Sequence, residues 1–523
     1  MAEAHLTRLG RWAAGLTLAQ VPTRTLRAAR AQVLDMVAAL HAAARSSEVR
    51  CVLEGSRGFA PSGGRATVLA TGERRGPADA ALANAACSMA QDFDDIVWMG
   101  HTCHSAVFAA LAVAEHEGCS SSEFLAAVVV ANELAGRLGA SSFLGPLNGQ
   151  MWTFVHLVGA AAATSKLLGL DEVRTTHALA IALSQPNFAL QPGFLKPSSK
   201  LLAAATPTAT GIQAAYFARS GMTGAPGILE DERGFWRRFA FLPMPFMLDG
   251  LGESWVLDTL TVKTFPGCHY FQTALTALER LRDRSGPFTL ERVRAVDLQA
   301  TKLACEATRF AGEYEAGEMT PVSVSFDLAQ SAAVLLQAGR LGTEELEAGY
   351  LARHEAPLRE WLGRIRVRHD PALTAKVLSG ARRLAGGSQA LSKLSLGKLA
   401  LLRRRYADEY RSSLFTWGDL LAAARGALED DAPESPTGEG VPLYFPARVT
   451  VTFSDGRTDR ERVDLPVGSV ASQGFDAELE RKVVRELTPT LGEAAARGAL
   501  DAGLRLETGP LDALVARFTA KLY

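Results

Sequence analysis

Residues 77–104 read PADAALANAACSMAQDFDDIVWMGHTCH, which sets a cluster of acids and two histidines between two alanine-rich apolar segments. Pro77 suits the first turn of a helix, and the small and apolar residues after it predict a closely packed helix. Residues 105–115 predict a second helix by their apolar spacing. Burying an unpaired carboxylate costs several kcal/mol, so we expect the acids to face water, a cation or a ligand. The sequence therefore places the chemistry in this gap, at the carboxylates of Asp92, Asp94 and Asp95.

The composition is that of a globular protein with a sizeable core. Of the 523 residues, 48% are hydrophobic and 21% are charged, and a chain of this length predicts roughly three domains. The 55 basic residues nearly equal the 56 acidic ones, so the chain has no overall field that would hold nucleic acid or an anionic membrane. We therefore expect a small-molecule partner, no nucleic acid and no membrane.

The cysteine pattern bears on the compartment. Six cysteines are scattered along the chain without a CxxC pair, which predicts reduced thiols. The N-terminal residues lack the continuous apolar stretch that directs export, and the strongest apolar run, residues 124–131, is too short to cross a bilayer. We expect a cytoplasmic protein that is neither exported nor inserted in a membrane.

The first half of the chain predicts a large all-helical domain, residues 1–262. Apolar residues recur at helical spacing, and abundant alanine allows helices to approach closely. Ser120 and Glu123 form a capping-box pattern before a long apolar segment, and Asp171 is placed to cap the segment that follows it.

After Lys263 the pattern changes to one that predicts a smaller α+β domain, residues 263–475. Alternating apolar residues occur at 296–300, at 365–367 and in ARVTVTF from Ala447, which runs into a Ser-Asp-Gly hairpin turn. Helical patterns cover residues 326–337 and 344–362. We expect helices in residues 476–523 that pack back on the helical domain.

Residues 372–440 predict a helical insertion in the second domain. The segment is basic around residues 403–405 and turns acidic and proline-rich from residue 429 to residue 440. Two interpretations stay open: a solvated helix with a flexible tether, or a docking surface for a partner.

Several segments resemble a known family: PADAALANAACSMAQDFDD, HTCHSAVFAALAVAEHEG, GAAAATSKLLGLDEVRTTHALAIALSQ, MTGAPGILEDERGF and KTFPGCHY. In order and spacing they resemble the MmgE/PrpD family, which includes 2-methylcitrate dehydratase, cis-aconitate decarboxylase and iminodisuccinate epimerase. The resemblance implies a mainly α fold, with a large all-helical domain and a smaller α+β lid domain, generally as a homodimer. Residues 371–441 are longer than the family usually carries there.

The resemblance implies three catalytic residues, His101, Asp92 and Lys200. Imidazole titrates near neutrality, so His101 is the natural proton carrier, and Asp92 would orient it or raise its pKa. Lys200 offers a point charge for a substrate carboxylate. Structural interpretations stay open for each of them: His101 as a helix-capping or core histidine, Asp92 as a helix cap or the partner of an arginine, and Lys200 as a snorkelling surface side chain.

The family pattern is broken at other positions. Ile96 stands where the family commonly has Thr, Gln150 and Ala203 stand where it has His, and Ser325 stands where it has Lys. These changes make part of the pocket less basic and more apolar, which favours a substrate that is less charged than a tricarboxylate.

Six further residues are candidates for substrate binding: Gln150, Lys263, Cys268, His269, His104 and His156. Lys263 and His269 suit carboxylate binding or packing between the domains. His156 sits among small residues and is either a core histidine or a compensating site residue. Cys268 has no evident activating base. His101 and His104 beside the carboxylates could ligate a divalent ion if the segment turns helically, but we expect no metal and no cofactor.

These observations predict a cofactor-independent lyase that acts on a small carboxylate by proton abstraction and donation, with loss of water or CO2. The same residues serve an isomerase, epimerase or cyclase equally well, because each reaction needs only placed proton carriers and cations. Since several polar family positions are lost, a non-catalytic binding or scaffold protein is the remaining alternative.

Overall fold

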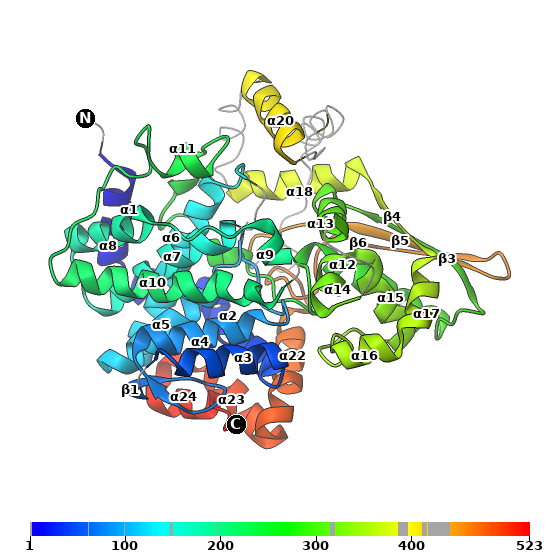
Figure 1. Cartoon of the computed structure of the whole chain (residues 1–523), viewed down its shortest axis with the longest axis horizontal. Coiled ribbons are helices and arrows are strands. Elements are labelled where there is room, and N and C mark those ends of the chain that lie inside the picture. The colour runs from blue at the N-terminus through cyan, green and yellow to red at the C-terminus, as the bar shows by residue number, and fades with distance from the viewer. Residues whose placement is uncertain are drawn as a thin grey trace.

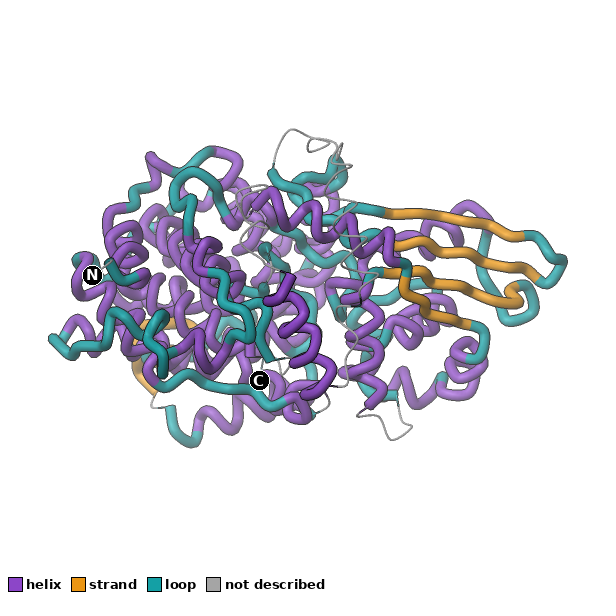
Figure 2. Tube along the Cα trace, turned by 90° about the horizontal axis from the view of Figure 1, so that it is seen from above, coloured by secondary structure: helices purple, strands orange, loops and turns teal. Residues whose placement is uncertain are grey.

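A computed structural model describes residues 3–60, 62–98, 100–146, 150–195, 197–313, 319–384, 396–410, 416 and 440–522. A large body of packed helices occupies one side of the molecule, and a smaller part with a twisted sheet occupies the other (Figures 1 and 2). The predicted fold class, mainly α with a second α+β part, is confirmed.

The helical body is built from the first half of the chain, with a small β-hairpin, β1 (Ser62–Thr67) and β2 (Arg74–Arg75), at one edge. Its helices are α1 (His5–Gly15), α2 (Thr23–Ala43), α3 (Ser47–Arg57), α4 (Pro77–Met89), α5 (Cys103–Glu117), α6 (Ser121–Ser141), α7 (Gln150–Leu167), α8 (Glu172–Ser184), α9 (Gln191–Leu195), α10 (Leu202–Arg219) and α11 (Phe235–Phe239).

The helix starts follow the capping residues of the sequence. Pro77 is the first residue of α4. The Ser120 hydroxyl accepts a hydrogen bond from the Glu123 amide, and the Glu123 side chain reaches back, so the predicted capping box is confirmed. Asp171 likewise accepts from the amide of Arg174 at 2.8 Å and caps α8. These caps satisfy amide groups that have no partner within the helix.

Small residues let the central helices pack backbone against backbone. Gly211 of α10 lies so close to α7 that a Cβ there would come within 2.4 Å of the Leu157 carbonyl oxygen. Only glycine fits that position. The close packing of α7 against α10 holds the start of α10 near the acidic segment.

One helix among the described residues, α6, is long and apolar enough to cross a membrane, with a mean hydropathy of 1.3 over its most apolar window. That window is 100% buried inside the protein. The helix also carries Glu133 and Arg137, which pair at 3.0 Å in its interior. The pair is buried together with the apolar run 124–131 in the interior of the body.

The second part contains a four-stranded sheet in the order β4-β3-β5-β6. The strands are β3 (Val293–Ala300), β4 (Ile365–His369), β5 (Ala447–Phe453) and β6 (Thr458–Val463). β3 and β4 are parallel, and the other neighbours are antiparallel. Gly456 adopts φ +87° in the β5–β6 turn, which is the left-handed conformation that favours glycine. The predicted strands and hairpin are confirmed.

Helices cover one face of this sheet (Figure 2). The helices that contact the strands are α12 (Gln272–Ser285), α13 (Lys302–Glu313) and α15 (Leu328–Ala338). The other helices of this part are α14 (Pro321–Phe326), α16 (Ala348–Arg353) and α17 (Glu355–Leu362). The single helix predicted over residues 344–362 is wrong, because Pro357 lacks an amide and its ring would clash with the carbonyl of Arg353 in a continuous helix. The chain therefore breaks at His354.

The C-terminal helices lie against the helical body. α22 (Phe475–Leu491) packs on α2, α23 (Glu493–Leu504) packs on both, and α24 (Leu511–Phe518) follows. In Figure 1 they form the orange and red group beneath the blue helices. The domain boundaries at residues 262 and 475 stay predictions.

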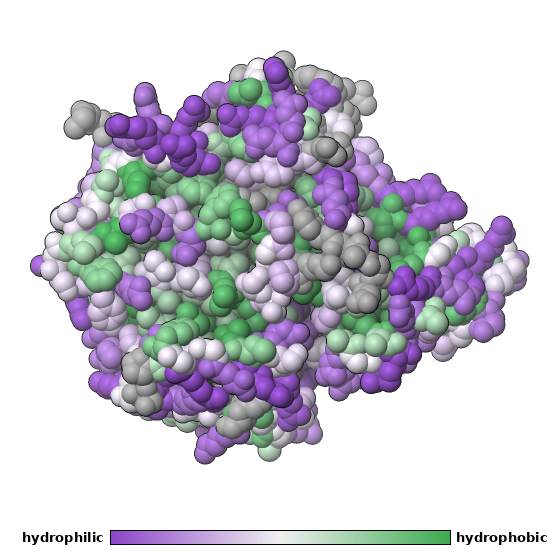
Figure 3. All heavy atoms as spheres, viewed as in Figure 1, coloured by the Kyte–Doolittle hydropathy of each residue, from purple (hydrophilic) through white to green (hydrophobic). Residues whose placement is uncertain are grey.

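The insertion contributes two described helices, α18 (Pro371–Leu384) and α20 (Leu396–Tyr410). Tyr406 of α20 is 1% exposed and donates a hydrogen bond to the Gly145 carbonyl at 2.7 Å. It packs with Leu402 against Leu144 and Leu242 of the body. The outer side of α20 is largely hydrophilic (Figure 3). The solvated-helix interpretation therefore holds for one face only, and the acidic linker at 429–439 lies outside the described residues.

Candidate active site

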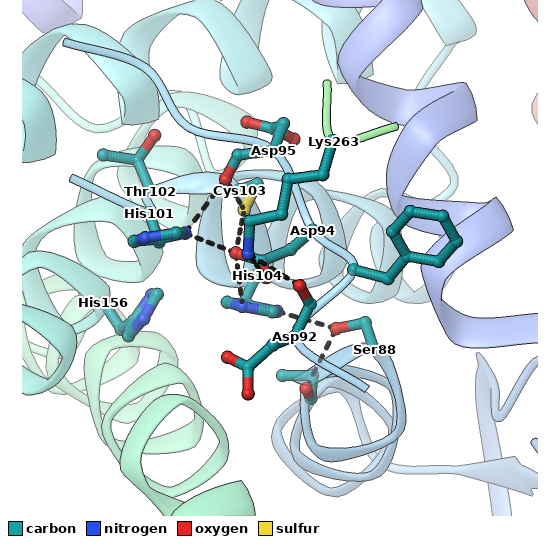
Figure 4. A network of polar contacts seen from close by, with 12 residues as sticks. Ser88, Asp92, Asp94, Asp95, His101, Thr102, Cys103, His104, His156 and Lys263 are labelled. Carbon is teal, nitrogen blue, oxygen red and sulfur yellow. Dashed lines mark hydrogen bonds and ion pairs between the residues drawn. The ribbon is translucent and has the colours of Figure 1, made fainter. Parts of the chain in front are cut away.

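The loop between α4 and α5, here called the acidic loop (residues 90–102), gathers the predicted site residues (Figure 4). Asp92 adopts φ +48°, in the left-handed region that few residues other than glycine, asparagine and aspartate enter. Its carbonyl accepts hydrogen bonds from Lys263 Nζ at 2.7 Å and from the Gly267 amide at 3.1 Å. These contacts from a distant segment hold a backbone conformation that is unfavourable by itself.

His101 is oriented by Asp94. Its Nδ1 lies 2.5 Å from Asp94 Oδ2 and 3.1 Å from the Asp95 carbonyl oxygen. Both neighbours are acceptors, so the neutral ring carries its proton on Nδ1 and Nε2 remains basic. The prediction that Asp92 orients His101 is therefore wrong, because the side chain of Asp92 points to a different partner.

The protonation states of this pair follow from their surroundings. Burial lowers the pKa of His101, and the neighbouring Asp94 carboxylate only partly offsets this. Burial would raise the pKa of Asp94, but the Lys263 ammonium and His101 outweigh it and hold that pKa well below its ordinary value. At neutral pH the pair is an ionised carboxylate and a neutral imidazole, which is the state required of a general base.

Lys200 pairs with the Asp92 carboxylate. It lies in the short 3₁₀ turn Ser198–Leu201 before α10 and is 2% exposed. Its ammonium sits 4.6 Å from the ring centroid of Phe326 and 5.5 Å from that of Phe194, distances typical of cation–π contacts. Phe326 belongs to α14, so the sheet-bearing part supplies an aromatic wall beside a site cation.

Lys263 is a second buried cation. Its Nζ lies 3.0 Å from Asp94 Oδ1 and donates to the Asp92 carbonyl. Burial lowers the pKa of Lys263, but Asp94 and Asp92 outweigh it and raise that pKa above its ordinary value. The structure thus shows Lys263 bridging two residues of the acidic loop, and its binding of a substrate carboxylate stays a prediction.

His104 and His156 lie close to His101 and Asp94 in the same group of polar side chains (Figure 4). His104 hydrogen-bonds Ser88 Oγ at 2.8 Å, and its Nε2 is 3.4 Å from Asp94 Oδ2. The His156 ring lies 5.5 Å from that of His104 and hydrogen-bonds Ser105. Burial, then His104, holds the pKa of His156 well below its ordinary value. His156 Nε2 has no hydrogen-bond partner among the described residues.

His269 lies at the second domain's side of the site and is 2% exposed. Neither of its ring nitrogens has a hydrogen-bond partner within the described part of the chain. Its ring packs edge-on against Phe445, with centroids 4.8 Å apart. Burial and then Lys263 hold the pKa of His269 well below its ordinary value. Leaving a buried polar group unsatisfied costs about 1–3 kcal/mol, so His156 and His269 are the groups that a ligand would satisfy.

Cys268 is not set up as a nucleophile. Burial raises the pKa of Cys268 to about 12, so its thiol is protonated at neutral pH, when a thiolate is needed. Its backbone amide instead donates to the Ser325 carbonyl at 2.7 Å.

Within the part of the chain that the structure describes, one group of side chains has metal-like spacing: Asp94, Cys103 and His104 place one ligand atom each within 4.8 Å of one another. The donor chemistry argues against an ion there. Burial and then the neighbouring carboxylates raise the pKa of Cys103 well above its ordinary value, and Asp94 already pairs with Lys263. A divalent ion would have to displace the thiol proton beside an ammonium.

Comparison with known proteins gives the family. Residues 7–242 match the model of the MmgE/PrpD N-terminal domain. Residues 7–242 therefore belong to the MmgE/PrpD family. It is 27% identical over 299 residues to cis-aconitate decarboxylase from Aspergillus terreus, a match that covers 52% of this chain and 59% of the relative.

Two further MmgE/PrpD relatives match shorter or more distant stretches. A cis-aconitate decarboxylase-like protein, oryM, from Aspergillus oryzae is 26% identical over 330 residues, covering 57% of this chain and 67% of the relative. Cis-aconitate decarboxylase from Homo sapiens is 32% identical over 203 residues, covering 36% of this chain and 41% of the relative. The match thus spans less than two thirds of the Aspergillus terreus enzyme.

Two of the four departures from the MmgE/PrpD pattern, Ile96 and Ser325, make contacts of their own in the structure. Ile96 is 2% exposed and bonds through its backbone to Thr261 at 3.0 Å. The Ser325 hydroxyl donates to the Pro321 carbonyl at 2.8 Å within α14. Ala203 is partly buried. Gln150 begins α7, but its side chain lies outside the described residues.

The sequence missed three contributors to the site: the orienting role of Asp94, the aromatic wall of Phe194 and Phe326, and the buried Lys482. Asp94 lies seven residues before His101, so its role required knowing how the loop folds. Lys482 donates to the Phe93 carbonyl from 389 residues away, and no local pattern signals such a contact.

Proposed function

We propose that this member of the MmgE/PrpD family is a cofactor-independent lyase that removes CO2 or water from a small carboxylate. The observation that carries the proposal is His101, held by an ionised Asp94 through Nδ1 so that Nε2 is the basic nitrogen, beside two buried ammonium groups. The relatives named as cis-aconitate decarboxylases support a lyase and favour loss of CO2.

In decarboxylation, the bond between the α-carbon and the leaving carboxylate breaks and its electron pair stays on carbon as an enolate. Lys200 and Lys263 supply positive charge near the developing anion. The protonated form of His101 then delivers its proton from Nε2 to that carbon. The negative charge of a bound carboxylate favours this protonated form, against the burial that lowers the pKa of His101.

In dehydration the order of events reverses. Neutral His101 takes the proton from the carbon next to the carboxylate, and a second acid protonates the departing hydroxyl so that water leaves. The lowered pKa of His101 suits this first step, because the ring is neutral before substrate binds.

The charges of the site favour a substrate with few carboxylates. Asp92 compensates Lys200 and Asp94 compensates Lys263, and burial keeps His156 and His269 neutral. Little positive charge is left to hold three carboxylates. We propose a mono- or dicarboxylate with an apolar portion that packs on the aromatic wall.

Isomerisation is the second candidate, because the site holds a second neutral imidazole, His156 of α7, whereas His101 lies in the acidic loop. Epimerisation requires proton carriers on both faces of one carbon. A lyase releases CO2 or water from the substrate, whereas an isomerase releases nothing.

The test is proton NMR in D2O of the purified protein with cis-aconitate and a panel of di- and monocarboxylates, their hydroxy analogues and their amino analogues. A lyase gives new vinyl or deuterated product signals with loss of CO2 or water, whereas an isomerase exchanges deuterium without loss. His101→Asn should abolish either signal. His354→Asn, a histidine stacked on Tyr350 in the sheet-bearing part, is the matched control and should leave it intact. Turnover that survives His101→Asn contradicts the proposal.

A homodimer is also proposed, on the family resemblance. One chain has a mass of 55.7 kDa, so light scattering on the eluted protein should give twice that mass. A monomer that turns over at full rate contradicts the dimer.

A further inference from the structure

A second cluster of buried charges contacts the acidic loop through the Phe93 carbonyl. Lys482 of α22 is 0% exposed. Its Nζ lies 2.7 Å from Asp35 Oδ1 on α2 and donates to the Phe93 carbonyl at 2.5 Å. The ammonium also sits 4.0 Å from the centroid of the Phe93 ring. None of these groups belongs to the proposed chemistry.

The contact falls at the centre of the site's backbone. Phe93 stands between Asp92, which pairs with Lys200, and Asp94, which orients His101. Lys263 holds the carbonyl of Asp92, and Lys482 holds the carbonyl of the next residue. Two lysines from distant segments therefore fix consecutive peptide groups, and with them the directions of both carboxylates.

The rest of the loop is held by uncharged groups. Gln32 Nε2 donates to Asp95 Oδ1 at 3.0 Å and to Asn132 Oδ1 at 3.2 Å. The Thr102 hydroxyl bonds the same Asn132 oxygen, which closes the other end of the loop. Gln32 lies on α2 and Asn132 on α6.

Burying Lys482 costs more free energy than packing on α22 requires. An ammonium moved into the interior loses several kcal/mol of hydration, and its ion pair with Asp35 regains this only in part. A methionine or leucine would fill the same space on α22 without that loss. Packing therefore does not explain the lysine, whereas its hydrogen bond to the Phe93 carbonyl of the acidic loop does.

We propose that Lys482 is a positioning residue of the active site, which sets the geometry of the Asp94–His101 pair through the Phe93 carbonyl. The proposal rests on the proposed function for its effect on turnover, but its effect on geometry stands by itself. Misplacing a catalytic group by about 1 Å costs on the order of 100-fold in rate. We expect Lys482→Met to lower kcat by that factor and to change KM little.

The first experiment reads the geometry without a substrate. The short bond between His101 Nδ1–H and Asp94 gives a downfield ring-proton resonance in water, which His101→Asn identifies by its disappearance. Lys482→Met should weaken or remove this resonance. Val483→Ala, also fully buried on α22, is the matched control and should keep it.

A second variant covers the case in which Lys482→Met does not fold, because that change leaves Asp35 as an uncompensated buried charge. Asp35→Asn/Lys482→Met removes both charges and avoids that penalty. It should fold and still lose the resonance and about 100-fold in kcat. A folded double variant that keeps the resonance and the wild-type kcat overturns the proposal. If wild type turns over no substrate, the lyase proposal fails while the resonance still decides the role of Lys482.

Discussion

Asp94 and Asp95 are neighbours in sequence and both are 0% exposed, yet only one of them is charged at neutral pH. Lys263 and His101 hold the pKa of Asp94 well below its ordinary value against the effect of burial. Burial, and then the neighbouring Asp35, raises the pKa of Asp95 well above its ordinary value. Asp94 is therefore a carboxylate and Asp95 a carboxylic acid.

Burial is equal for the two carboxyl groups, so their charged neighbours decide which of them is ionised. We call the side of the loop at Asp92 and Asp94 the site face, and the side at Asp35 and Asp95 the back face. On the site face, each carboxylate has its own ammonium, Lys200 or Lys263. On the back face, Lys482 is the ammonium beside two carboxyl groups, those of Asp35 and Asp95. With one ammonium for two carboxyl groups, Asp95 keeps its proton and Asp35 pairs with Lys482. Neither carboxyl group is therefore free to orient an imidazole by its charge.

The largest effect should come from Asp94→Asn. The amide keeps the shape but loses the charge that orients His101, and it can turn an N–H toward Nδ1. We expect kcat to fall about 10³- to 10⁴-fold with the substrate found by NMR. Asp79→Asn, in the first turn of α4, is the control and should stay within about twofold of wild type.

Next is Lys263→Met, which removes the ammonium from Asp94 and leaves a buried carboxylate. We expect the free energy of unfolding to fall by about 3–5 kcal/mol at pH 7, measured by urea denaturation. Part of this loss should return at low pH, where Asp94 can be protonated. Equal losses at pH 7 and pH 5 would show that Lys263 acts by packing.

The back face gives a pH-dependent prediction through Asp35. Burial raises the pKa of Asp35 to about 6 despite the nearby Lys482. A raised folded pKa adds stability below the unfolded value, about 3.9, and that stability is lost as pH rises through about 6. Relative to Asp35→Asn, the wild type should therefore lose about 2 kcal/mol of unfolding free energy between pH 4 and pH 7. If the difference in unfolding free energy between wild type and Asp35→Asn does not change with pH, Asp35 is not the group that binds the proton.

The smallest effect should come from Asp95→Asn. The amide resembles a protonated carboxyl and can still accept from Gln32. We expect less than about 1 kcal/mol lost in unfolding free energy and less than about tenfold in kcat. If Asp95→Asn costs as much as Asp94→Asn, the two faces are not distinguished by charge.

The local parts of the fold could be predicted from the sequence. Caps such as Ser120 and Asp171 act within one turn of their own helix, and the alternation in ARVTVTF reports one buried face of a strand. Such patterns depend on neighbours a few residues away. The break between α16 and α17 was missed because the apolar spacing hid the effect of Pro357.

The site was predicted less completely, for the same physical reason. The cluster at residues 92–104 was found because its acids and histidines are close in sequence. The partner of His101 was assigned wrongly, as Asp92 instead of Asp94. The two acids are two residues apart, and the backbone turn at the positive φ of Asp92 decides which of them faces His101. Lys200, Lys263 and Lys482 reach the loop from three distant segments, and only the fold pairs each with its carboxylate.

The hydrogen bond from Lys482 to the Phe93 carbonyl also determines when the site can be completed during protein synthesis. Asp94 and His101 leave the ribosome together and early, followed by Lys200 and Lys263. Lys482 lies in the last tenth of the sequence. Until α22 has been made and has docked on α2, the peptide group between the two site carboxylates lacks its anchor, so a nascent chain can hold a nearly complete helical body without a finished site.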